Sequence, residues 1–268
     1  MSTPRLPDYS ILDRPQILSC LFHPRRESAL RKAPASAIDI RIRVASDAAV
    51  GACFHMASKA NPNILFFHGN GEIVADYDDL GPYFNRLGMN FLPVDYRGYG
   101  RSTGVPGVAS MMADCHKILA FVISWLKDGQ YHGPLIAMGR SLGSAAALEL
   151  AAGQRDVLDA LVIESGFAYA GPLLKVLGID PQGIGFREEE GFSNIDKMHA
   201  WDKPALIIHA EYDHIIPFGD GQALYEACPS VRKKLLKIPG ANHNNIFQLG
   251  LTPYMAAIGR LSEALNKR

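Results

Sequence analysis

The sequence predicts a single α/β domain built around a mostly parallel sheet. Short, continuous apolar runs recur along the chain, as expected for strands buried on both faces of a parallel sheet. Between them lie longer segments with apolar residues three or four apart, the spacing of amphipathic helices. Strands and helices therefore alternate, which favours an α/β architecture. The predicted buried strands cover residues 64–67, 90–96, 135–138, 160–164, 205–209 and 233–238.

An antiparallel hairpin is predicted before the first buried strand. Residues 38–44 alternate apolar and polar side chains, which indicates a half-exposed strand, and residues 50–56 are predicted to return beside it. Five prolines interrupt residues 1–36, so we expect an irregular N-terminal arm with a short helix near residues 14–20. The predicted helices are 76–87, 108–127, 142–152, 217–227 and about 244–267.

Composition narrows the classes of partner. The chain has 268 residues, with 27 Lys and Arg and 27 Asp and Glu. It therefore lacks the excess of basic residues that is typical of nucleic-acid-binding proteins. No apolar run approaches the ~20 residues of a membrane span, and no signal peptide is recognised. The four cysteines are widely separated, which is typical of reduced structural thiols. We expect one domain over residues 1–268, located in the cytoplasm. The oligomeric state is not predicted.

A serine stands at the sharpest turn that the sequence predicts. Residues 139–143 read Gly-Arg-Ser-Leu-Gly, between the strand at 135–138 and the helix at 142–152. This is the G-x-S-x-G spacing of a nucleophile elbow, in which glycines avoid collisions around a strained serine. Ser141 is therefore the candidate nucleophile. It needs a base, an acid that orients the base, and donors for an oxyanion.

The base is predicted from position, because groups that meet in an open α/β sheet lie after the carboxyl ends of strands. Of nine histidines, His243 follows the strand at 233–238 and precedes a helix, and it is our candidate base. The candidate acid is Asp213, after the strand at 205–209, with Glu164 as its rival. The order serine, aspartate, histidine matches the triad order of one known fold. A metal site at His209, Asp213 and His214 is not expected, since their spacing gives no ligand geometry.

The oxyanion donors are expected on two backbone segments. One is the amide of Leu142, which directly follows the nucleophile. The other is in the His-Gly-Asn-Gly loop at 68–71, where glycines let the backbone approach a substrate, and Asn70 is our choice. His68 is expected to support this loop rather than to act as a second base. Neither this loop nor the Gly-Tyr-Gly at 98–100 has the spacing of a dinucleotide-binding fingerprint.

Five motifs together resemble the α/β-hydrolase superfamily. The chain looks most like its serine-hydrolase branch of monoglyceride-lipase-like, protein-depalmitoylating and serine-aminopeptidase-like enzymes. The resemblance implies an eight-stranded sheet that begins with the 38–56 hairpin, and no cofactor. Ala210 departs from the Gly often found there, and the lid region at 166–200 is short. The motifs are HGNG at 68–71, DYRGYGRS at 95–102, GRSLG at 139–143, the Asp213 segment ending in Ile216-Pro217, and PGANH at 239–243.

These observations lead to a functional hypothesis. Ser141, His243 and Asp213 would transfer the acyl group of a small carboxylic ester or thioester to water through an acyl-enzyme. Peptide hydrolysis is the alternative within enzymes, and a catalytically inactive interaction module on the same fold is the alternative outside them. No nucleic-acid partner, integral membrane segment or metal is expected. The lid region offers apolar side chains for an acyl pocket, for which packing within the lid is an equal alternative: Phe167, Leu173, Leu174 and Leu177.

Overall fold

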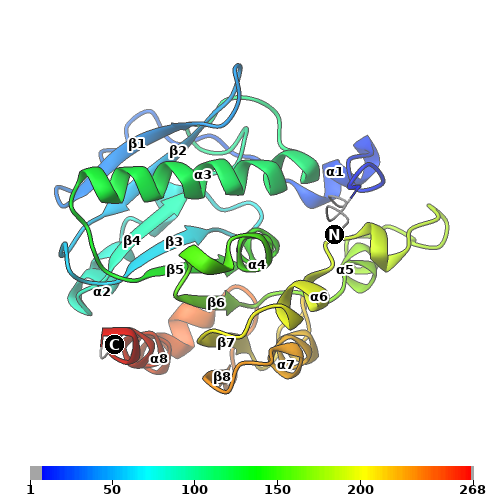
Figure 1. The fold of residues 1–268 in the computed structure, drawn as a ribbon. Coiled ribbons are helices and arrows are strands. Elements are labelled where there is room, and N and C mark those ends of the chain that lie inside the picture. Colours follow the sequence, from blue (N-terminus) through cyan, green and yellow to red (C-terminus); the bar gives the residue numbers. More distant parts are fainter. Residues whose placement is uncertain (1–7, 267–268) are drawn as a thin grey trace, which may run out of the picture.

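The computed structural model describes residues 8–266 and contains an eight-stranded sheet (Figure 1). The strand order is β1-β2-β4-β3-β5-β6-β7-β8. Strands β3 to β8 are parallel, whereas β1 pairs antiparallel with β2, and β2 with β4. The predicted fold class and N-terminal hairpin are confirmed. The strands are β1 Ala37–Arg43, β2 Ala49–His55, β3 Asn63–Phe67, β4 Asn90–Val94, β5 Leu135–Arg140, β6 Ala160–Glu164, β7 Ala205–Ala210 and β8 Lys233–Ile238.

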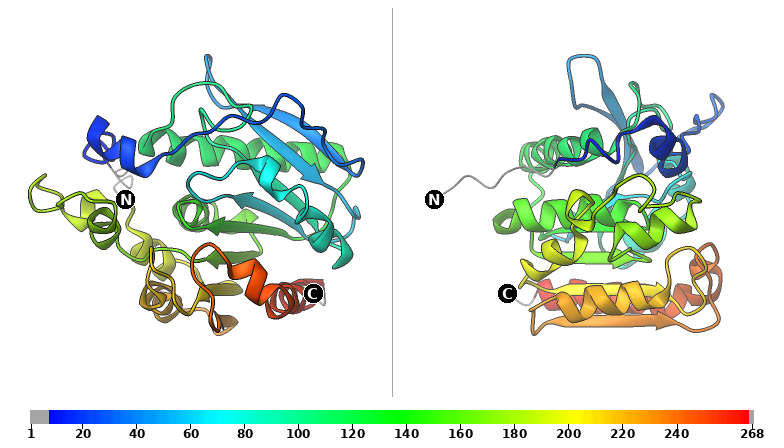
Figure 2. Two further views of the ribbon diagram at one scale, coloured as in Figure 1. Left: turned by 180° about the vertical axis from the view of Figure 1, so that it is seen from behind. Right: turned by 90° about the vertical axis from the view of Figure 1, so that its right-hand side faces the viewer.

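Helices cover both faces of the sheet, which explains why every residue of strands β3 to β7 is buried and most are apolar. One apolar cluster packs α3, α4, α6 and α7 against one face, and a second packs α2 and α8 against the other (Figures 1 and 2). The helices are α1 Pro15–Leu21, α2 Gly81–Arg86, α3 Val108–Asp128, α4 Gly143–Gly153, α5 Ala170–Val176, α6 Asn194–His199, α7 Phe218–Ala227 and α8 Ile246–Asn266.

Helix α3 is long and apolar enough, by length and composition alone, to cross a membrane. Its apolar face is instead packed into the core of the domain, where residues such as Val108, Ile118 and Val122 are buried. A strongly apolar helix of this kind is typical of a large α/β core. No other helix of the described residues meets the same length and hydropathy limits.

One predicted helix is divided. Instead of a helix over 76–87, the chain forms a 3₁₀ turn at Val74–Tyr77 and then α2. Pro82 lies in the first turn of α2, where its missing N–H costs nothing, so it favours a new helix start rather than continuation. The 3₁₀ turn packs separately against β2 and β4.

Two short segments lie side by side at the end of the sheet that carries the turn between β5 and α4. They are α1 of the N-terminal arm and α5 of the 166–200 region, adjacent in every view of Figures 1 and 2. The Arg14 guanidinium donates a hydrogen bond of 3.0 Å to the carbonyl of Ile184, which links the arm to this region. The short helix expected near residues 14–20 is confirmed as α1. Residues 1–7 of the predicted arm lie outside the described residues.

Candidate active site

The turn between β5 and α4 holds Ser141 in the left-handed region, with φ +51°. Such a backbone conformation is strained for a non-glycine residue. The flanking glycines are required by close backbone approach. A Cβ atom on Gly139 would lie 2.2 Å from the carbonyl oxygen of Gly143, and one on Gly143 would lie 2.1 Å from the carbonyl oxygen of Phe67. Glycine therefore allows β5, β3 and α4 to converge tightly enough to present the serine.

The structure brings the predicted base and acid to this serine. The Oγ of Ser141 is 3.0 Å from Nε2 of His243, and Nδ1 of His243 is 2.7 Å from Oδ2 of Asp213. His243 lies in the loop between β8 and α8, and Asp213 in the loop between β7 and α7. With a carboxylate at Nδ1, the ring carries its proton there and leaves Nε2 to accept the proton of Ser141.

Asp213 is held as a carboxylate. Burial alone would raise its pKa, but the hydrogen bond and charge of His243 outweigh burial. The amides of Ile216 and Ile215 also donate to Oδ1, at 2.8 and 3.0 Å. The net result is a pKa below its usual range, because these partners favour the charged form. A permanently charged Asp213 can orient the His243 ring and stabilise it once it is protonated.

Asn70 and Leu142, the two predicted oxyanion residues, both line the cavity beside Ser141. Among residues 8–266, no group accepts a hydrogen bond from the amide of either residue. The amides can therefore serve an incoming oxygen atom. The Asn70 side chain is occupied elsewhere, because its Oδ1 accepts hydrogen bonds of 2.8 Å from the His23 amide and from the Tyr99 hydroxyl.

The cavity has a volume of about 260 Å³ and contains Ser141 and His243. Leu173 and Leu177, four residues apart on α5 and its C-terminal end, line it as predicted from the lid region. Phe167 and Leu174 do not line this cavity; both are buried in the core, and Phe167 borders a smaller neighbouring pocket that shares Leu173. Their part in an acyl pocket stays a prediction. Leu174 follows Leu173 by one residue, a helical rotation of about 100° that turns it inward.

Comparisons with known proteins identify similar hydrolases. Residues 58–181 match the family described as serine aminopeptidase S33. The chain is 31% identical to mouse alpha/beta hydrolase domain-containing protein 17C over 210 residues, 76% of this chain and 61% of that one. It is 28% identical over 192 residues to protein bem46 of Schizosaccharomyces pombe, 70% of this chain and 63% of that one. The chain thus spans about three fifths of these relatives.

Solved structures share the fold. A Pyrococcus furiosus esterase superposes with a TM-score of 0.73 at 16% identity, over 91% of this chain and 99% of that one. A monoglyceride lipase variant from Saccharomyces cerevisiae gives a TM-score of 0.68 at 19% identity, over 90% and 98%. The chain has the fold of the α/β-hydrolase superfamily. Its strand order, nucleophile turn and serine–aspartate–histidine order follow the pattern of that superfamily.

Sequence reasoning overlooked one residue of this site, Arg140, which directly precedes the candidate nucleophile. Its guanidinium is buried and donates hydrogen bonds to Glu72 at 2.7 Å, to Glu164 at 2.6 Å and to the carbonyl of His243 at 2.9 Å. Glu72 in turn accepts a hydrogen bond of 2.6 Å from the amide of Gly69. One side chain therefore joins the oxyanion loop, strand β6 and the histidine loop. The available signal was a charged residue at the end of a buried strand, together with one glutamate at the end of β6 and another in the loop after β3.

The other acidic and histidine side chains near these strand ends have structural partners. Glu164, the rival acid, accepts a second hydrogen bond from Tyr254 at 2.7 Å and so serves Arg140 instead of His243. Glu211 accepts hydrogen bonds of 2.9 Å from Lys237 and from the amide of Gly240. His209 is buried, with Nε2 2.8 Å from the carbonyl of Ile216. His68 is buried and its Nδ1 lies 2.8 Å from the carbonyl of Gly69, which fits the predicted role in supporting the loop.

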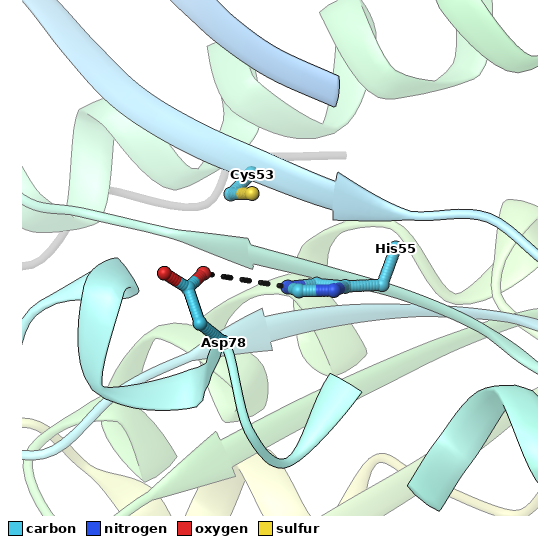
Figure 3. A group of neighbouring side chains, drawn as sticks. All are labelled: Cys53, His55 and Asp78. Carbon is cyan, nitrogen blue, oxygen red and sulfur yellow. Dashed lines mark ion pairs between the residues drawn. The ribbon is translucent and has the colours of Figure 1, made fainter. Parts of the chain in front are cut away.

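A second polar cluster lies on β2, as Figure 3 shows. Cys53 and His55 are two residues apart on one face of the strand, and Nε2 of His55 is 3.9 Å from Asp78. Their spacing resembles a metal-ligand set. However, both oxygens of Asp78 already accept hydrogen bonds of 2.7 Å from Arg31, and burial raises the pKa of the Cys53 thiol to about 12 and lowers that of His55. The cluster thus fits the Arg31 guanidinium better than a metal ion, and the expectation of no metal site stays a prediction.

Proposed function

We propose that the chain is a serine hydrolase that cleaves a carboxylic ester or thioester through an acyl-enzyme. One observation carries this proposal: the continuous hydrogen-bond chain from Ser141 through His243 to Asp213, at a cavity with two unoccupied backbone donors. The fold of the α/β-hydrolase superfamily supports the broader assignment to hydrolases. Charge balance across the chain is consistent with a small-molecule substrate.

The proposed reaction follows from the positions of these groups. Nε2 of His243 removes the proton of Ser141 as the hydroxyl attacks the substrate carbonyl. The carbonyl oxygen becomes negative and is bound by the amides of Asn70 and Leu142. Asp213 stabilises the protonated imidazole, which then gives its proton to the leaving oxygen or sulfur atom. Water, activated by the same histidine, attacks the acyl-enzyme and releases the acid and Ser141.

Two alternatives remain as separate hypotheses. Peptide hydrolysis is favoured by the match of residues 58–181 to the serine aminopeptidase family, and it requires His243 to protonate an amine leaving group. An interaction module without activity would have no need of an aligned serine, histidine and aspartate. The hydrogen bonds of 3.0 and 2.7 Å between them therefore argue for the enzyme.

A labelling and turnover experiment tests the proposal. Wild-type protein should react with a fluorophosphonate probe and hydrolyse p-nitrophenyl esters, and Ser141→Ala should do neither. Aminoacyl p-nitroanilides offered in parallel separate the peptidase alternative, which predicts their faster turnover. The serine-hydrolase proposal fails if the folded wild type takes up no probe, or if Ser141→Ala turns esters over equally fast.

Asp213→Asn supplies a second test with a matched control. The amide would favour the wrong tautomer of His243, so kcat should fall by roughly 10⁴, the size of this effect in a well-studied triad. Glu211→Gln changes a carboxylate two residues earlier that bonds Lys237, and it should keep nearly full kcat. Equal kcat values for the two variants would remove Asp213 from the proposed mechanism.

A further inference from the structure

Two of the segments that line the cavity beside Ser141 are far apart in the sequence. Leu173 and Leu177 contribute the apolar side chains of α5, and Leu21 and His23 contribute the end of α1 and the residues after it. The N-terminal arm therefore supplies a wall of the cavity. Leu21 is 2% exposed, so this wall is a packed surface and not a loosely covering tail.

Several contacts fix the arm at this position. Phe22 is buried in the main core. The Arg25 side chain donates a hydrogen bond of 2.7 Å to the carbonyl of Gly71 and forms an ion pair with Asp76. Arg26 donates a hydrogen bond of 2.7 Å to the carbonyl of Ser102. Further along, Arg31 holds Asp78 in the cluster of Figure 3. Together, the packing of Phe22 and the polar contacts of three arginines attach the arm to the domain.

The same segment contacts the oxyanion loop directly. The amide of His23 donates hydrogen bonds of 2.8 Å to the side chain of Asn70 and to the hydroxyl of Tyr99. Tyr99 itself donates to Asn70 at 2.8 Å. The arm thus occupies a fixed position relative to the donor that would bind the oxyanion, and a substrate carbonyl bound there has its acyl chain between the arm and α5.

We propose that the N-terminal arm, through Leu21 and His23, is the element that limits the acyl chain, and that the substrate class is esters or thioesters of short acyl groups. This inference rests on the proposed serine-hydrolase function. The cavity of about 260 Å³ is smaller than the ~300–1,000 Å³ typical of pockets for drug-sized ligands. A long acyl chain would have to displace Leu21 from its packing, whereas a short one fits between Leu21 and Leu173.

The experiment compares kcat/KM for acetyl, butyryl, octanoyl and palmitoyl p-nitrophenyl esters. Wild type should prefer acetyl or butyryl. Leu21→Ala should raise the octanoyl-to-acetyl ratio by about tenfold, the discrimination available from a few buried methylenes. Leu18→Ala is the matched control, because Leu18 lies on the same helix and does not line the cavity. Its ratio should equal that of wild type.

His23→Trp is a second test of the same wall, for use if Leu21→Ala is too unstable to assay. His23 is exposed, so the larger ring is tolerated and should lower the octanoyl-to-acetyl ratio. A wild type that prefers palmitoyl esters, or a ratio unchanged in both wall variants, overturns the assignment of the arm while ester hydrolysis stands. Absence of any turnover and of fluorophosphonate labelling instead refutes the proposed function itself.

Discussion

The guanidinium of Arg140 donates a hydrogen bond of 2.9 Å to the backbone carbonyl of His243. The residue before the nucleophile thus holds the loop that carries the base. The same side chain forms ion pairs with two glutamates, Glu72 and Glu164. The position of the histidine and the charge balance of the site therefore depend on one buried cation.

Replacing Arg140 should lower the free energy of unfolding. Arg140→Met would leave Glu72 and Glu164 without their cation, and removal of one partner of a buried ion pair typically costs about 3–5 kcal/mol. Glu164→Gln should cost less, because burial already raises the pKa of Glu164 and the neutral amide keeps a hydrogen-bonding side chain there. Urea unfolding measures both free energies. Similar losses in the two variants would show that Arg140 does not organise the cluster.

Tyr99→Phe should impair the chemical step more than substrate binding. It removes the hydroxyl that donates to Asn70 and accepts from His23, so the oxyanion loop loses about 1 kcal/mol of restraint, equivalent to roughly a fivefold fall in kcat. KM should change little. Tyr131→Phe is the control, since that ring stacks on Trp125 at the far end of α3. A fall in kcat of the same size in both variants would contradict the role of Tyr99.

Glu72 should make stability depend on pH. Burial opposes its ionisation, but the charge of Arg140 and a hydrogen bond from Tyr77 lower the pKa of Glu72 from 4.5 to about 2. A lowered folded-state pKa stabilises the fold above the unfolded value and loses that contribution as pH falls through the folded one. The stabilisation is therefore complete above about pH 5 and declines between 4.5 and 2.

Thermal unfolding of Glu72→Gln checks this dependence. Its melting temperature should lie below that of wild type at neutral pH, and the difference should shrink as the pH is lowered from about 5 to 3. Glu226→Gln, at an exposed position on α7, should differ little from wild type throughout. A gap between wild type and Glu72→Gln that stays constant over this range would be inconsistent with the lowered pKa.

The sequence predicted the candidate catalytic residues best, because the topology of a parallel sheet limits where such residues can lie. Because parallel strands end at one edge of the sheet, the loops after β5, β7 and β8 could be assigned to one place, and the structure brings Ser141, Asp213 and His243 together there. The sequence could not decide whether Phe167 and Leu174 line the cavity, because an apolar side chain near a site can also pack into the hydrophobic core. Only the rotation of α5 separates Leu173 from Leu174.

The arm could not be placed from sequence for a different physical reason. Several of its polar contacts end on backbone carbonyls, those of Gly71, Ser102 and Ile184, and any residue presents such an acceptor. Prolines in the arm correctly predicted irregular backbone but carried no information on what it touches. Contacts made to main-chain atoms leave no pattern of residue types in the partner segment.

The attachment of α1 also has a consequence for the order of folding. Arg26 forms a bridge with Gly100, and Arg14 contacts Ile184, 170 residues further along the chain. Closing such long loops is entropically expensive and comes after local structure has formed. The wall that α1 adds beside Ser141 is therefore expected to form late in folding, after the segment that carries Ile184 has taken its place.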